Sequence, residues 1–183
     1  MAPHPSPEEL MARLQAARET GDARQPSPAR LQSLRELVRD CPALTPALLD
    51  LARLLPRADE PGVETEQSLG EAGKLLEQAV LVSRRSAPAV VELGYFLDVY
   101  RDSPEAEALF EEGARTALKT LEAAWTGLLR FWAYTRTKES LEKALRLARL
   151  AEQVFPESLN LLGEVETVRT YARQDGVPDS TVP

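Results

Sequence analysis

Apolar residues recur along this chain at intervals of three and four, the spacing of one face of an α-helix. The clearest case is segment 90–113, which reads VVELGYFLDVYRDSPEAEALFEEG and contains two such runs on either side of the break at residues 101–104. Small and large residues are mixed in both runs: Leu93, Gly94 and Leu97 in the first, Ala106, Phe110 and Gly113 in the second. This pattern predicts two antiparallel helices packed closely together.

Runs of the same kind predict further helices at residues 6–20, 27–41, 45–55, 68–83, 121–136, 137–155 and 158–173. Ser-Pro or Thr-Pro pairs begin at Ser6, Ser27, Thr45 and Ser103. A hydroxyl at the N-cap with proline in the first turn is typical of a helix start, so these pairs are interpreted as caps rather than phosphorylation sites. Residues 57–67 have no helical periodicity and predict an interior loop with a solvated acidic surface.

The pattern of small and large residues repeats. Ala72, Leu76 and Ala79 recur 34 positions later as Ala106, Phe110 and Gly113, and 38 positions after that as Ala144, Ala148 and Ala151. A period of this length is typical of repeat architectures.

On these residues, together with Val90, Leu93, Gly94 and Leu97, the chain resembles the tetratricopeptide repeat family. The resemblance implies an all-α fold: a right-handed superhelical stack of antiparallel helix pairs with about eight or nine helices. We expect one such domain over residues 6–173, with the interior loop at 57–67 and a capping helix at 158–173. Residues 1–5 and 174–183 are expected to be disordered. Trp132 departs from the family pattern, because a large ring stands where glycine or alanine is usual.

The resemblance also implies a concave groove, lined by the first helix of each pair, in which a peptide or helix of a partner protein lies. The residues that helical geometry assigns to this groove are Leu49, Arg53, Val91, Tyr95, Asp98, Leu129, Arg136, Asn160 and Glu164. Tyr95 and Arg136 suit recognition, since aromatic and arginine side chains dominate binding hot spots. A second interpretation stays open, in which Val91 and Leu129 are buried between repeats while Asp98 and Arg136 only keep the surface soluble.

Charge and composition narrow the possible partners. The net charge of −7, without a basic stripe, argues against a nucleic acid partner, and no apolar run approaches the ~20 residues of a membrane-spanning helix. The N-terminus lacks the features of a signal peptide, so we expect a cytoplasmic protein. Arginine outnumbers lysine 18 to 4, which suggests a bacterial genome rich in G and C.

The sequence favours a non-catalytic protein without metal or cofactor. His4 is the only histidine and Cys41 the only cysteine, so one chain cannot assemble a catalytic triad or a His/Cys zinc site. Glu111 and Glu112 point about 100° apart on a helix and cannot hold one substrate atom together. Two classes remain: an adaptor or chaperone-like module that binds a peptide or helix of another protein, and a structural protein that assembles as a homo-oligomer.

Overall fold

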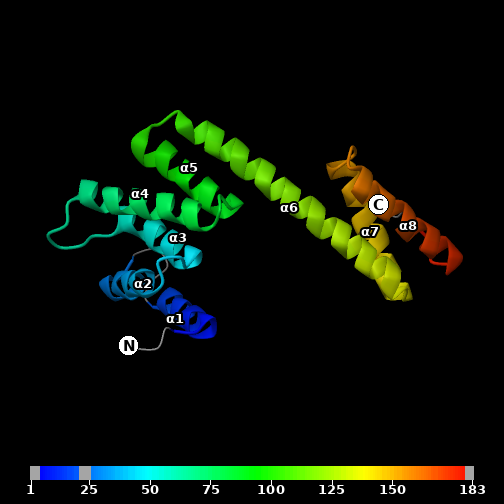
Figure 1. The fold of residues 1–183 in the computed structure, drawn as a ribbon, viewed down its shortest axis with the longest axis horizontal. Coiled ribbons are helices and arrows are strands. Elements are labelled where there is room, and N and C mark those ends of the chain that lie inside the picture. The colour runs from blue at the N-terminus through cyan, green and yellow to red at the C-terminus, as the bar shows by residue number, and fades with distance from the viewer. Residues whose placement is uncertain (1–4, 21–25, 180–183) are drawn as a thin grey trace. The chain divides into compact units, whose positions relative to one another are not determined.

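The structure is a computed structural model that describes residues 5–20 and 26–179. Within these ranges the chain forms eight α-helices and one short 3₁₀ helix, η1, and no strand (Figure 1). The helices are α1 (Pro7–Glu19), α2 (Pro28–Asp40), α3 (Thr45–Leu54), η1 (Leu55–Arg57), α4 (Thr65–Val82), α5 (Ala87–Arg101), α6 (Glu105–Thr135), α7 (Lys138–Val154) and α8 (Leu159–Gln174). The predicted all-α class and the number of helices are confirmed. The right-handed superhelix stays a prediction, and the expected disorder of residues 1–5 falls almost wholly outside the described residues.

The chain divides into two compact units, residues 1–114 and 115–183, and α6 contributes to both. Each unit has its own hydrophobic core. The single repeat domain predicted over residues 6–173 stays a prediction.

In the first unit, helices α1 to α5 pack in chain order, each against the next. Leucines from α1, α2, α3 and η1 form the centre of its core: Leu14, Leu31, Leu34, Leu37, Leu48, Leu51 and Leu55 are 0–1% exposed. The first two predicted caps are confirmed, since the Ser6 and Ser27 hydroxyls each accept a backbone N–H hydrogen bond at 3.2 Å. Thr45 is not a cap: it is already helical, and the capping position falls on Leu44.

The hairpin of α5 and α6 has the close packing that the sequence predicts. The break falls at residues 102–104, where Asp102 takes a left-handed conformation with φ 45° and ends α5. A methyl group added at Gly94 would lie 3.0 Å from the Phe110 ring, and one added at Gly113 would collide with Val91. Both glycines therefore let the two helix backbones approach.

The prediction of a separate helix at residues 121–136 is wrong, because α6 continues without interruption through Thr135. The segment between the two predicted helices, residues 114–120, is ARTALKT and contains neither proline nor glycine. Alanine, arginine, leucine and lysine are strong helix formers, so nothing in this segment ends the helix. A single helix therefore spans residues 105–135, where the sequence predicts two.

The interior loop is shorter than predicted, since η1 extends to Arg57 and α4 begins at Thr65. Its acidic residues are also not merely solvated. Glu60 accepts two hydrogen bonds from Arg35, at 2.7 and 2.8 Å, and Glu71 on α4 accepts two more from the same guanidinium. Arg35 thus fastens the loop to α2 and α4.

The core of the second unit is formed by α7, α8 and the second half of α6. Its most buried residues include Leu129, Leu141, Ala144, Ala148, Ala151, Leu161 and Val165. Trp132, the departure from the family pattern, is partly buried and packs against this core.

The sequence predicts a disordered tail from residue 174, but the structure differs over residues 174–179. Gln174 is the last residue of α8, and the Val177 side chain is 6% exposed within the core of the second unit. The backbone N–H of Val177 donates to the carbonyl of Ala172 at 2.8 Å. One apolar side chain among polar neighbours was too weak a signal to predict this packing. Residues 180–183 lie outside the described residues.

Candidate functional site

The candidate site is a pocket of about 240 Å³ in the first unit, formed by α3, η1, α4 and α5. Its aromatic and aliphatic residues come mainly from the last two turns of α5, with Leu76 of α4 beneath them. The lining residues are Ala52, Arg53, Pro56, Arg57, Leu76, Glu92, Tyr95, Phe96, Val99 and Tyr100. A concave apolar pocket with a few polar groups is the usual form of a binding site.

Aromatic side chains hold the shape of this pocket. The Tyr95 ring packs edge-on against Phe110, with ring centroids 5.0 Å apart, and Phe96 lies 5.8 Å from Tyr100. Phe96 sits deep because α4 offers Gly73 beneath it, where an added methyl group would lie 3.2 Å from the ring. Tyr95 nevertheless remains 55% exposed and Val99 62% exposed. The floor is therefore rigid, while its apolar rim is available to a ligand.

Charges on one side of the pocket join α3 to α5. Arg53 donates to Glu92 at 2.6 Å, and this hydrogen bond raises the pKa of the Arg53 guanidinium above its ordinary value. Arg53 also lies 3.5 Å from Asp50, which accepts a hydrogen bond from Arg18 of α1 at 2.6 Å. A row of alternating charges thus links the first helices of three successive pairs.

Arg57 also lines the pocket, and no carboxylate among the described residues neutralises its guanidinium. Its guanidinium donates only to the carbonyl oxygen of Arg53, at 3.2 Å. An arginine at the edge of an aromatic pocket can take a carboxylate from a ligand. The pocket therefore fits an apolar side chain with an acidic group nearby.

The predicted groove residues of the first unit are only partly brought together. Arg53 and Tyr95 line the pocket, and Asp98 is exposed without lining it. Leu49 is 6% exposed in the core, and Val91 is partly buried against Gly113. For Val91 the geometry agrees with the second interpretation, burial between helices.

In the second unit, Leu129 is fully buried, while Asn160 is exposed and Glu164 partly buried. Arg136 donates to Asp175 at 2.8 and 3.0 Å and lies 4.6 Å from the centre of the Tyr171 ring. The hydrogen bond with Arg136 lowers the pKa of the Asp175 carboxyl. Arg136 therefore fastens the end of α8 to the end of α6. The assignment of Leu129, Arg136, Asn160 and Glu164 to a partner-binding groove stays a prediction.

Sequence reasoning missed Arg57, Glu92, Phe96, Val99 and Tyr100. The signal was present in α5: Glu92, Phe96 and Val99 follow each other at intervals of four and three and share one face. The predicted face, through Val91 and Asp98, was one residue too early. The turn of η1 that adds Arg57 had no signal in the sequence, because the predicted helix ended at residue 55.

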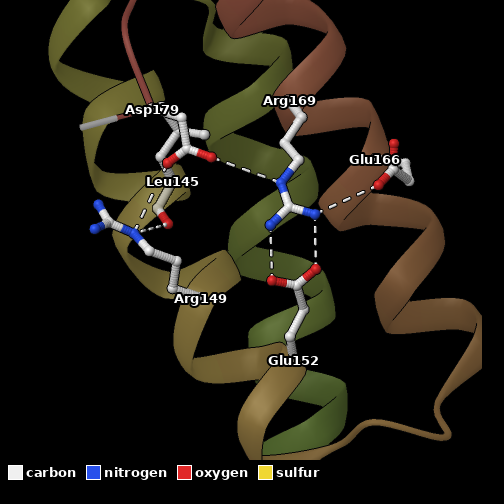
Figure 2. Close-up of polar contacts among 6 residues, drawn as sticks. All are labelled: Leu145, Arg149, Glu152, Glu166, Arg169 and Asp179. Atoms are coloured by element: carbon white, nitrogen blue, oxygen red, sulfur yellow. Dashed lines mark hydrogen bonds and ion pairs between the residues drawn. The ribbon is translucent and has the colours of Figure 1, made fainter. Parts of the chain in front are cut away.

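A cluster of charged residues in the second unit has a structural role. Figure 2 shows Arg169 of α8 facing Glu152 of α7, joined by two hydrogen bonds of 2.7 Å. Asp179 lies 3.7 Å from the Arg169 guanidinium and 3.8 Å from that of Arg149, and Glu166 completes the group. Each carboxylate faces an arginine, so the cluster joins α7, α8 and the segment after α8.

Residues 5–20 and 26–179 contain neither a cluster of metal-ligating side chains nor a membrane-spanning helix. No three side chains of His, Cys, Asp or Glu in this part of the chain gather as metal ligands would. None of its helices combines the length and hydrophobicity needed to cross a bilayer.

Comparison with known proteins agrees with this architecture. A model of the Myxococcota tetratricopeptide repeat protein family matches residues 2–84, which include α1 to α4. A protein of Myxococcus xanthus, described as an uncharacterized 18.1 kDa protein in the carS 3' region, is 34% identical over 164 residues. That match covers 86% of this chain and 90% of the relative.

Residues 2–84 of this chain belong to the Myxococcota tetratricopeptide repeat protein family, and the predicted resemblance to tetratricopeptide repeats is confirmed. The matched residues end before the α5–α6 hairpin, on which the resemblance was mainly built. The predicted bacterial origin agrees with the source of the relative.

Proposed function

We propose that this protein is a non-catalytic interaction module that holds a peptide or helix of a partner protein against the pocket of α3, η1, α4 and α5. Membership of the tetratricopeptide repeat family supports a protein-interaction role in general. The observation that carries the finer proposal is the apolar rim of the pocket. Tyr95 and Val99 are more than half exposed there, although large apolar side chains such as these are usually buried.

The chemistry of the pocket supports a peptide rather than a small polar metabolite. Its lining is mainly aromatic and aliphatic, and Arg53 and Glu92 already neutralise each other. An apolar side chain of the partner fills the pocket, and the residues next to it in the partner's sequence lie along α3 and α5. Such a contact needs binding and no bond chemistry.

The test is a pull-down from a Myxococcus xanthus lysate, read by mass spectrometry. The variant Tyr95→Ala with Val99→Asp removes the apolar rim and adds a charge to it, and we expect the captured proteins to be lost. Met11→Ala is the matched control, since Met11 is 48% exposed on α1 and does not line the pocket. A captured set that is the same for both variants and the wild type contradicts the proposal.

The alternative, a structural protein that assembles as a homo-oligomer, has one observation in its favour: α6 exposes large apolar side chains in the second unit. Light scattering over a range of concentrations separates the two, because a constant monomer excludes assembly. Cytoplasmic location and the lack of nucleic acid and membrane partners stay predictions.

A further inference from the structure

The chain does not leave the second unit where α8 ends. Residues 175–179, which we call the strap, turn back at Gly176, whose φ is 68°, and place the Val177 side chain in the core of that unit. A glycine with positive φ followed by a buried apolar residue is a common cap of a helix C-terminus. Asp179 lies beyond this cap, and its carboxylate faces arginines of both α7 and α8. The strap therefore makes contacts that capping alone does not need.

The contacts of Asp179 are weaker than those that hold α7 to α8. In Figure 2 its carboxylate lies between the guanidinium groups of Arg149 and Arg169, at 3.8 and 3.7 Å, and the side chain is 40% exposed. Ion pairs this long and this exposed contribute little to stability. Glu152, by contrast, forms two hydrogen bonds of 2.7 Å with Arg169 and joins the two helices without the strap. The strap can therefore leave while α7 and α8 stay together.

Further arginines flank the two that face Asp179. Arg146 lies one turn before Arg149 on α7, and Arg173 lies one turn after Arg169 on α8. Both flanking arginines are exposed, and within residues 5–20 and 26–179 neither is paired with a carboxylate. One turn of helix rises about 5.4 Å, and each residue of an extended segment spans about 3.3 Å. Carboxylates one or two residues from the position of Asp179 would therefore be within reach of these arginines.

We propose that the surface of α7 and α8 beneath the strap is a binding site for an acidic segment of a partner protein, and that the strap occupies this site when no partner is bound. The segment carries an apolar residue at the position of Val177 and a carboxylate two residues later, with further Asp or Glu next to it. It makes the contacts of the strap and adds ion pairs with Arg146 and Arg173. Clusters of arginine recognise acidic motifs in this way. The site lies wholly in the second unit and does not depend on the pocket of α3 and α5.

The shortness of the strap favours a different protein over a second copy of this chain. A strap bound to another copy stays joined to its own α8 through Gly176, and the three residues from there to Asp179 span at most about 10 Å. Exchange of straps would thus bring the ends of both α8 helices close together. Arg169 and Arg173 of one copy would then repel the same arginines of the other. An acidic segment from a different protein brings no such repulsion.

The experiment measures, by fluorescence anisotropy, how a fluorescein-labelled peptide binds to the full-length protein. The peptide has the sequence of residues 174–179 followed by two glutamates. In the wild type the strap competes as a tethered ligand, so the apparent affinity is reduced by the fraction of molecules whose site is open. Asp179→Lys places a cation between two arginines and opens the site, so this variant should bind the peptide at least about tenfold more tightly. Glu157→Lys, the same change of charge at an exposed residue away from the strap, should keep the wild-type affinity.

Two further measurements locate the bound peptide. Arg149→Glu should abolish binding, whereas Arg130→Glu, which reverses an arginine on α6, should not. Hydrogen exchange followed by NMR reports on the backbone N–H of Val177, which donates to the carbonyl of Ala172. In the wild type, saturating peptide should speed this exchange, because the strap leaves the core. Circular dichroism checks that each variant is folded.

Three results with the peptide overturn the proposal. They are equal affinities of the Asp179→Lys and Glu157→Lys variants, equally tight binding of a peptide with Asn and Gln in place of its acids, and bound peptide that leaves the exchange of Val177 unchanged. A dimer in light scattering that Val177→Asp abolishes also overturns it, because the occupant is then the strap of a second copy.

Discussion

Two glycines on α6 give a sharp test of the α5–α6 hairpin. Gly113 faces α5, and a methyl group there would collide with Val91; Gly127 has nothing within 4 Å of its added methyl group. Replacing glycine by alanine inside a helix gains about 1 kcal/mol of stability from helix propensity. This gain is common to Gly113→Ala and Gly127→Ala, so it cancels when the two variants are compared.

What remains in the comparison is the cost of overpacking. Forcing an extra methyl group into a well-packed contact typically costs about 1–3 kcal/mol. We therefore expect Gly113→Ala to be less stable than Gly127→Ala by about 1–3 kcal/mol. Adding Val91→Ala removes the colliding methyl groups, so the double variant with Gly113→Ala should recover most of this difference.

The assay is urea unfolding followed by circular dichroism, with hydrogen exchange of α5 as a local readout. Trp125 and Trp132 both lie in the second unit, so tryptophan fluorescence serves as the control for unfolding outside the hairpin. Equal stabilisation by Gly113→Ala and Gly127→Ala would refute the close packing of α5 on α6. A collision that Val91→Ala does not relieve would show that the contact lies elsewhere.

Two further substitutions test the loop and the C-terminal segment. Glu60→Gln should cost about 1–2 kcal/mol at pH 7, because Glu60 accepts two hydrogen bonds from Arg35. Arg35 lowers the pKa of Glu60 below its ordinary value of 4.5, so the stabilisation is present above that value and lost as pH falls through the lowered pKa. Urea unfolding should thus separate the variant from the wild type at pH 7 and not at strongly acid pH; a gap that persists in acid is incompatible with this role. Val177→Ala should cost about 1–2 kcal/mol in unfolding followed by tryptophan fluorescence, since Val177 is buried in the core of the second unit. Pro178→Ala, at an exposed neighbour, should have little effect, and equal effects would mean that the segment does not pack.

Sequence reasoning succeeded where each local signal agreed with the packing. The small and large residues of the repeat all lie on packed faces: Ala72 and Ala79 on α4 and Ala144 and Ala151 on α7 are fully buried. The break before α6 was also predictable, because proline and polar residues interrupt both helical runs there. Periodicity therefore predicted which face of each helix is buried.

Sequence reasoning failed where two patterns overlap, or where two residues in contact are far apart in the sequence. The residues between Gly113 and Leu121 carry no helix-stopping signal, yet a repeat requires a turn, and the local preference prevailed. Glu60 was predicted to be solvated because its partner Arg35 lies 25 residues away in the chain, and Asp179 was assigned to a disordered tail although Arg169 lies ten residues before it. In the candidate site, Tyr95 and Arg53 were found by helical geometry, but the position of Arg57 depends on a single turn of 3₁₀ helix that contains Pro56.

The continuous α6 makes residues 114–120 unlike the other connections of this protein. A helical connection depends on the helix propensity of every residue in it, so a proline at any of these positions would interrupt α6. Loops such as residues 58–64 lie at the surface and tolerate such a residue. The residues that this connection admits are therefore more restricted than those of a loop of the same length.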